Sequence, residues 1–302
     1  MNTYSKKLLS VEQQLEAYKT AGMIINSDDE ARTALQNIGY YRLRGYCFHL
    51  YDNNAKKYLN SVNFSDILKL YEFDTELSHL IFSMTTKIEV SLRSRLIDAL
   101  LIYNDALIWS EPSIYSDKQH FYQNLSAISS EIARSSDVFI QHHFHNYDGD
   151  VPIWAAVEVM SFGTLSKTIN NLKTGTASAY AVLSRHYCYT SQRGNLVAPS
   201  LRMFSSWVRS TVILRNMCAH NSRIYNRTIN TSPQLLRVDQ PTKKTNRCGL
   251  YQIILAMKYL SPSAKDWSEF KNDLTALFKR YESIIELNRL NFPTDWKTHL
   301  NS

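Results

Sequence analysis

The sequence predicts an all-α protein, and three observations support that prediction. Glycine and proline number only 8 and 7 in 302 residues, too few for a β protein with many turns. Neither interrupts the stretch from 65 to 103, where apolar side chains recur at intervals of three and four, the period of a helix. No segment shows the convincing alternation of apolar and polar residues that marks a strand.

The first two helices are predicted from signals at their ends. Residues 10–13 (SVEQ) have the pattern of a capping box, in which the serine caps the helix and the glutamine reaches back. That helix should reach about Ala21 and stop at Gly22. A second helix near 28–37 has acidic residues in its first turn, which suits the positive end of the helix dipole, and should end at Gly39.

The segment Tyr40–Tyr46 mixes aromatic side chains with arginines and supports two interpretations. It could be a surface that stacks on bases and grips phosphates. It could also be a helix that buries its tyrosines while Arg42 and Arg44 extend to water. The second interpretation is favoured, because tyrosine is abundant in this chain, with 19 in all.

The stretch 65–103 should form either one helix of about 39 residues or two shorter helices. Glu89 and Arg93 lie one turn apart on it and should pair. From the residues alone, this is an ordinary surface ion pair.

Three histidines within 141–145, with Asp148 and Asp150 nearby, raise the question of a metal site. Their spacing matches no standard ligand set, so a polar loop or an RNA-facing edge is favoured. We predict neither a metal nor a cofactor for this protein.

The remaining helices follow from the same periodicity. Glu158 lies on a largely apolar helix flank, one turn past Trp154, where we expect it to be buried. A buried carboxylate needs a partner, and an arginine of the later basic cluster is the candidate. Residues 231–248 are polar and basic and predict a loop. Helices are predicted over 117–134, 153–172 with a bend or close packing at Gly163, 177–187, from 199 into the 215–227 motif, 249–260, and from Pro262, after a Ser261 cap, to about 290.

Bulk properties narrow the class of partner and compartment. The net charge is +7, which favours an anionic partner without choosing between nucleic acid and anionic lipid. The four cysteines stand far apart, so neither a zinc motif nor a disulfide framework is indicated. Because the N-terminus has no apolar signal core and no apolar run approaches ~18 residues, we expect a cytoplasmic chain with no membrane partner.

The most distinctive polar cluster emerges from an apolar run. Residues 207–214 should be buried, and they lead into RNMCAHNSRIYNR at 215–227. Arg215 offers a planar, permanently charged fork suited to phosphate. His220 can take or give a proton near neutral pH. These two residues are the primary catalytic candidates.

Neighbouring residues extend this cluster. Asn216 would hold a phosphate or fix the imidazole orientation, and Arg223 and Arg227 follow His220 at helical spacing. On a regular helix, Arg215 and His220 would point about 140° apart. They can therefore act together only if the helix ends or bulges there, if the arginine reaches around, or if two chains contribute.

A second Arg-x-x-x-x-His pattern, Arg44 to His49, differs in its surroundings. His49 lies in an apolar and aromatic run, YCFHLY, where a satisfied core histidine is the better interpretation.

The motif at 215–227 resembles the signature of the HEPN ribonucleases. More closely, the chain is similar to the abortive-infection (Abi) bacteriophage-resistance proteins of bacteria, over about residues 10–230. In that family a second histidine often follows the first, and this chain has Asn221 there. Three other stretches contribute to the resemblance: 37–46 (NIGYYRLRGY), 87–93 (KIEVSLR) and 152–163 (PIWAAVEVMSFG).

The resemblance implies a HEPN-like helical bundle with helical extensions at both ends. We expect an N-terminal helical segment over 1–60, a HEPN-like core with the catalytic motif over 61–235, and a basic loop with C-terminal helices over 236–302. It also implies a homodimer whose two motifs face each other. It adds a second interpretation of Glu89 and Arg93, namely that they line the cleft and orient Arg215 and His220.

The function that follows is a metal-independent endoribonuclease that acts as the toxic effector of phage defence. Arg215, Asn216 and His220 would be catalytic at a dimer cleft, where the RNA's own 2′-hydroxyl attacks the phosphate. An antitoxin or a regulatory RNA could restrain it. The alternatives are a non-catalytic RNA-binding or phage-sensing module and a plain helical interaction protein. Residues expected to contact the substrate are Glu89, Arg93, Glu158, Arg223 and Arg227.

Overall fold

A computed structural model describes residues 7–59, 61–239 and 249–301. Over this part of the chain the fold is all-α, as predicted, with thirteen α-helices and two short antiparallel hairpins. The hairpins were not expected, because each strand has only two residues and is too short to show alternation. They consist of β1 (Tyr51–Asp52) with β2 (Lys57–Tyr58), and β3 (Tyr189–Thr190) with β4 (Leu196–Val197).

The N-terminal helices confirm the end signals in the sequence. Ser10 Oγ accepts a hydrogen bond from the Gln13 N–H (3.3 Å), and the Gln13 side chain accepts one from the Ser10 N–H (2.9 Å), a complete capping box. Gly22 follows the first helix with φ of +86°. The three helices are α1 (Val11–Thr20), α2 (Asp28–Asn37) and α3 (Tyr40–Cys47).

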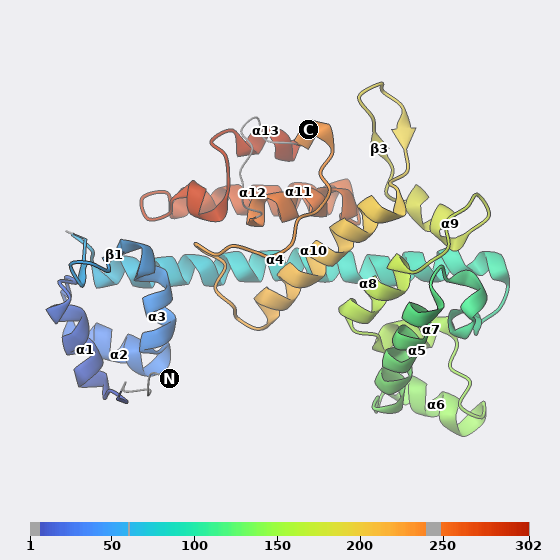
Figure 1. Ribbon diagram of the computed structural model, residues 1–302, viewed down its shortest axis with the longest axis horizontal. Helices are drawn as coiled ribbons and strands as arrows, with labels where there is room; N and C mark the ends of the chain where they lie inside the picture. Colours follow the sequence, from blue (N-terminus) through green and yellow to red (C-terminus); the bar gives the residue numbers. More distant parts are fainter. Residues whose placement is uncertain (1–6, 60, 240–248, 302) are drawn as a thin grey trace.

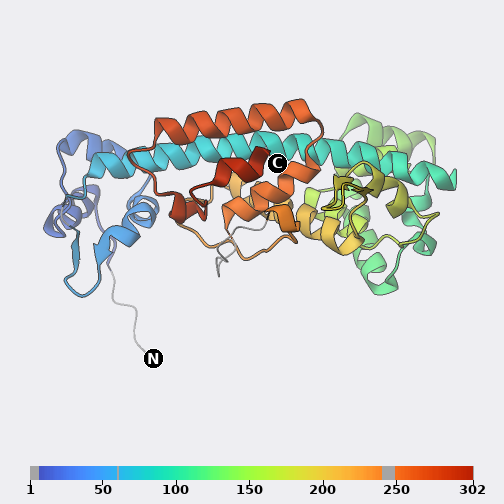
Figure 2. The same cartoon turned by 90° about the horizontal axis from the view of Figure 1, so that it is seen from above.

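The axis of the fold is α4 (Phe64–Leu100), one unbroken helix of 37 residues that reaches about 55 Å. Asn63 caps it, accepting from the Ser65 N–H. Helices α1–α3 lie at one end of α4, α5–α9 at the other, and α10 crosses it (Figure 1). The second view shows α12 running alongside α4 (Figure 2). Buried apolar residues on α4 include Ile67, Leu70, Phe73, Leu77, Ile81, Met84, Ile88, Leu92 and Leu96.

Two predictions about the middle of the chain are wrong. Residues 141–145 belong to a helix and not to a loop, and the alternative of an RNA-facing edge stays a prediction. The segment 153–172 is two helices, and the break falls at Met160 and Ser161, whose ψ angles of 135° and 154° are extended, and not at Gly163. The elements here are α5 (Lys118–Ala133), α6 (Val138–Asn146), α7 (Ile153–Val159), α8 (Phe162–Asn170) and α9 (Ala179–Arg185).

The C-terminal helices cover one side of α4 and α10. Trp207 of α10 is fully buried and stacks on Tyr259 at 5.0 Å between ring centroids. The predicted Ser261 cap is wrong, because Ser263 caps the next helix and Pro262 precedes that cap. These elements are α10 (Leu201–Ala219), α11 (Leu250–Leu260), α12 (Ala264–Arg280) and α13 (Trp296–Asn301).

Short 3-10 helices connect several elements, at Phe48–Leu50, Leu101–Tyr103, Ile108–Ser110, Pro112–Ile114, Arg237–Asp239 and Leu287–Leu290. Of the predicted loop 231–248, residues 240–248 lie outside the described part of the chain. Among the described helices, none combines the length and apolar character that crossing a membrane requires. The predicted division at residues 60 and 235 stays a prediction.

Candidate functional site

Arg215 lies near the end of α10 and turns toward α4. Its Nη2 and Nε both donate to one carboxylate oxygen of Glu89, at 2.7 and 3.2 Å, and its Nη1 donates to Asn216 Oδ1 at 3.0 Å. The guanidinium carbon is 5.9 Å from the centre of the Phe162 ring. The side chain is still 27% exposed, so it is fixed in orientation but open to solvent.

Glu89 and Arg93 form a buried pair, so the surface ion pair expected from the residues alone is wrong. The second oxygen of Glu89 accepts from Arg93 Nη2 at 2.5 Å. Arg93 also donates to the Met160 carbonyl at 2.8 Å and to the Val157 carbonyl. These carbonyls lie where α7 ends, and Arg93 satisfies them, which compensates for the hydrogen bonds lost at the break before α8.

His220 is where α10 ends. The Asn221 N–H donates to the Cys218 carbonyl (3.0 Å), and the Ser222 N–H donates to the Met217 carbonyl (2.8 Å), the two bonds of a Schellman motif. Asn221 occupies the left-handed position of that motif with φ of +50°. His220 is therefore the last residue before the chain reverses, and its side chain is exposed.

The side chain of His220 borders an open pocket of about 610 Å³ between α3 and the segment after α10. Arg215 is not among its lining residues, in agreement with the angle of about 140° expected between them on a helix. Within one chain, Arg215 and His220 thus face different parts of the surface. The pocket brings His220 together with Tyr41, Arg42, Arg44, Phe48 and Arg223.

The favoured interpretation of the Tyr40–Tyr46 segment is correct in part, and the base-stacking interpretation stays a prediction. Tyr46 is buried and Arg42 and Arg44 reach the surface, as the favoured interpretation required, but Tyr41 is 91% exposed. His49 is in the core as predicted, yet its Nδ1 has no hydrogen-bond partner among the described residues, and burial lowers the pKa of its imidazole.

Asp74 of α4 is a site residue that the sequence analysis missed. Its buried carboxylate accepts from Tyr46 Oη at 2.7 Å, from the Ile224 N–H at 3.0 Å and from the Tyr225 N–H at 2.7 Å. Burial raises the pKa of Asp74. The signal that could have found it is a lone carboxylate on the apolar face of the long helix.

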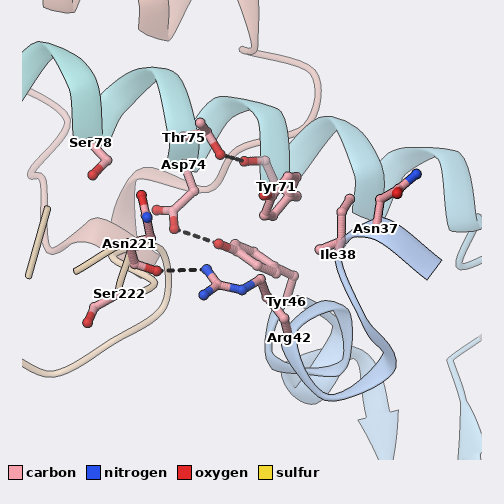
Figure 3. Close-up of a pocket in the computed structure, with 10 residues that line it drawn as sticks. All are labelled: Asn37, Ile38, Arg42, Tyr46, Tyr71, Asp74, Thr75, Ser78, Asn221 and Ser222. Carbon is pink, nitrogen blue, oxygen red and sulfur yellow. Dashed lines mark hydrogen bonds between the residues drawn. The ribbon is translucent and has the colours of Figure 1, made fainter. Parts of the chain in front are cut away.

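The Asp74 contacts close a second pocket, of about 310 Å³, that α3, α4 and the segment after α10 share (Figure 3). On its other side Arg42 Nη1 donates to the Asn221 carbonyl at 2.7 Å. Side chains of α3 and α4 therefore hold the chain that follows His220 from two directions (Figure 3).

Three of the predicted substrate contacts sit differently from expectation. Arg223 and Arg227 do not continue a helix, because α10 has ended; Arg223 Nη1 donates to the Tyr225 carbonyl at 2.7 Å, and Arg227 is exposed. Glu158 is exposed and not buried, since it lies on the same outer face of α7 as Trp154, which is 54% exposed. The roles of these residues in substrate binding stay predictions.

The sequence comparisons identify the family of this chain. A family described as Abi-like protein matches residues 33–226, from α2 to the segment beyond α10. The chain belongs to the Abi-like family. Membership indicates a role in abortive infection, the defence of bacteria against phage. The match includes Asp74, Glu89, Arg215 and His220 but stops before α11. No curated protein and no solved structure matches this Abi-like chain.

Proposed function

We propose that this Abi-like protein is a HEPN-type endoribonuclease that cuts RNA without a metal ion and acts as the toxic effector of phage defence. The observation that supports it most is that Glu89 fixes the orientation of Arg215 while Arg215 and His220 both remain open to solvent. A guanidinium has five N–H groups. Glu89 and Asn216 engage three of them, which leaves two for a phosphate oxygen.

The chemistry uses groups that the chain and the RNA supply. A base removes the proton of the 2′-hydroxyl, the oxygen attacks the adjacent phosphorus, and the bond from phosphorus to the 5′-oxygen breaks as an acid protonates that oxygen. His220 is the proton carrier, because it is the only histidine in the motif and is exposed. The products are a 2′,3′-cyclic phosphate and a 5′-hydroxyl end.

Arg215 stabilises the charge that builds on the phosphate oxygens in the transition state. Glu89 fixes the guanidinium before substrate arrives, so little reorganisation is needed when the charge appears. Asn216 accepts from Arg215 and has amide N–H groups of its own that can donate to a phosphate oxygen.

A second copy of the chain completes the site in this proposal. Arg215 and His220 lie about 140° apart on α10, so one phosphate cannot meet both on the same face. A two-fold axis beside the end of α10 would place the arginine of one chain opposite the histidine of the other.

The pocket beside His220 supports RNA as the substrate. Arg42, Arg44 and Arg223 border it, and none of the three has a carboxylate partner among the described residues. Tyr41 and Phe48 at the same pocket are 91% and 60% exposed, and exposed aromatic rings can stack on unpaired bases.

The test is incubation of the purified full-length protein with total RNA in the presence of a chelator. We expect cutting by the wild type and a loss of about 10²–10⁴-fold in His220→Ala. His120→Ala, at another exposed histidine, is the matched control and should cut normally. Ends carrying a cyclic phosphate would support the mechanism.

Three outcomes would overturn this proposal. RNA binding without any cutting would assign the protein to the non-catalytic RNA-binding class. Absence of both binding and cutting would leave a helical interaction protein. Equal cutting by wild type and His220→Ala would remove the histidine from the mechanism.

A further inference from the structure

A large open pocket lies away from the candidate catalytic residues. It has a volume of about 1160 Å³ and is bordered by α8, by α10 and by residues 230–232. We call it the α8–α10 groove. Lys167, Arg202 and Arg209 line it, and its lining contains no Asp or Glu. None of these three cations has an ion-pair partner in the described part of the chain.

The groove continues the face of α10 that carries His220. Successive residues of a helix are rotated by about 100°, so positions 202, 209 and 216 all point within about 40° of position 220. Arg202, Arg209 and His220 are all exposed. From Arg202 to His220 this strip is about 27 Å long. A molecule bound at His220 can therefore extend along α10 into the groove.

The rest of the lining suits a nucleic acid strand. Hydroxyl and amide side chains, which commonly contact phosphate and sugar oxygens, make up much of the wall. Ser205 Oγ is buried there and has no hydrogen-bond partner among the residues that the structure describes. Val212 and Ile213 add an apolar patch.

We propose that the α8–α10 groove binds the sugar-phosphate backbone of an RNA strand that also reaches His220. That the bound strand is cut at His220 rests on the proposed function, but binding in the groove does not. An acidic polypeptide would also meet the cations. The continuity of the groove with His220 and the hydroxyl-rich wall favour RNA.

The experiment measures binding of a labelled oligouridylate to full-length His220→Ala, which prevents cleavage during the titration, over a series of salt concentrations. Arg202→Gln and Arg209→Gln are each added to that protein. Each substitution should weaken binding. Each should also make the negative slope of log affinity against log salt less steep by about 0.7, the value for one phosphate contact on a single strand. Lys265→Gln removes the same charge from α12, where the side chain is 85% exposed, and should leave the slope unchanged.

Unchanged slopes in both arginine variants, with their folding verified by circular dichroism, would overturn the inference. So would polyglutamate displacing the oligouridylate at equal charge concentration, because the groove would then accept any polyanion. The two proposals can fail separately. If the wild type does not cut RNA but the arginine variants still change the salt dependence of binding, the nuclease proposal is wrong and the groove proposal stands.

Discussion

Arg215 of α10 and Glu89 of α4 are joined through a single carboxylate oxygen, which accepts from both Nη2 and Nε of the arginine. The other oxygen of Glu89 accepts from Arg93, so one buried carboxylate lies between two guanidinium groups. A carboxylate in this position has two consequences. It neutralises charge inside the fold, and it determines where the arginine of the motif points.

The first prediction concerns Glu89→Ala. Removing the carboxylate leaves the Arg93 side chain, which is only 11% exposed, without its counter-charge. We expect the free energy of unfolding to fall by about 3 kcal/mol, the lower end of the range for a broken buried pair, because Arg215 retains contact with water. Urea denaturation measures this. Glu269→Ala, at an exposed pair with Lys87, should change stability little; an equal loss in both would contradict a special role for Glu89.

The second prediction concerns pH and Asp74. Burial raises the pKa of this carboxyl above its ordinary value of 3.8, so the folded chain holds the proton to higher pH than the unfolded chain. The stabilising contribution is complete below that ordinary value and is lost as pH rises through the raised pKa. Relative to Asp74→Asn, the wild type should lose unfolding free energy as the pH rises above the ordinary value of 3.8. If the wild type instead gains unfolding free energy relative to Asp74→Asn as the pH rises, the three hydrogen-bond donors around Asp74 outweigh its burial.

The third prediction separates conformation from chemistry at Asn221. Because its φ is +50°, Asn221→Gly should keep the wild-type stability, whereas Asn221→Ala should cost about 1 kcal/mol. Thermal or urea unfolding of the two variants checks this. Equal stability of the alanine and glycine variants would contradict a backbone role. A glycine variant that is stable but cannot cut RNA would instead assign the amide to the substrate.

The fourth prediction tests whether two chains share one site. Arg215→Ala and His220→Ala should each be nearly inactive alone. When they are co-expressed, mixed pairs hold one intact arginine and one intact histidine at the shared cleft, so cutting should return in part. The measurement is RNA cleavage by the purified mixture, with each variant alone as control. No recovery, in a sample whose mass shows mixed pairs, would contradict the two-chain site.

Features specified by neighbouring residues were predictable from the sequence. The capping box at Ser10 and Gln13 involves two residues three positions apart, and the start of the helix followed from it, while Gly22 indicated its end. The unbroken length of α4 was allowed, but one helix and two were equally consistent with its periodicity. The angle between Arg215 and His220 also followed, since it depends only on helix geometry.

Features specified by distant residues were not predictable. The break at Met160 is stabilised by Arg93, which lies 67 positions earlier in the chain. Asp74 meets the Ile224 N–H across 150 positions. Glu158 was misplaced for a related reason: the apolar sequence around it packs through other faces of α7, and only the packed structure shows which face is covered.

The two anchors on α4 have a joint consequence for control. Glu89 holds the arginine, and Asp74, about 22 Å farther along the same helix, holds the backbone just past the histidine. Both ends of the motif are thus held by the same helix, α4, and do not move independently of it. We therefore expect a molecule that regulates this protein to block or open access to the motif, because little remains to be aligned within one chain.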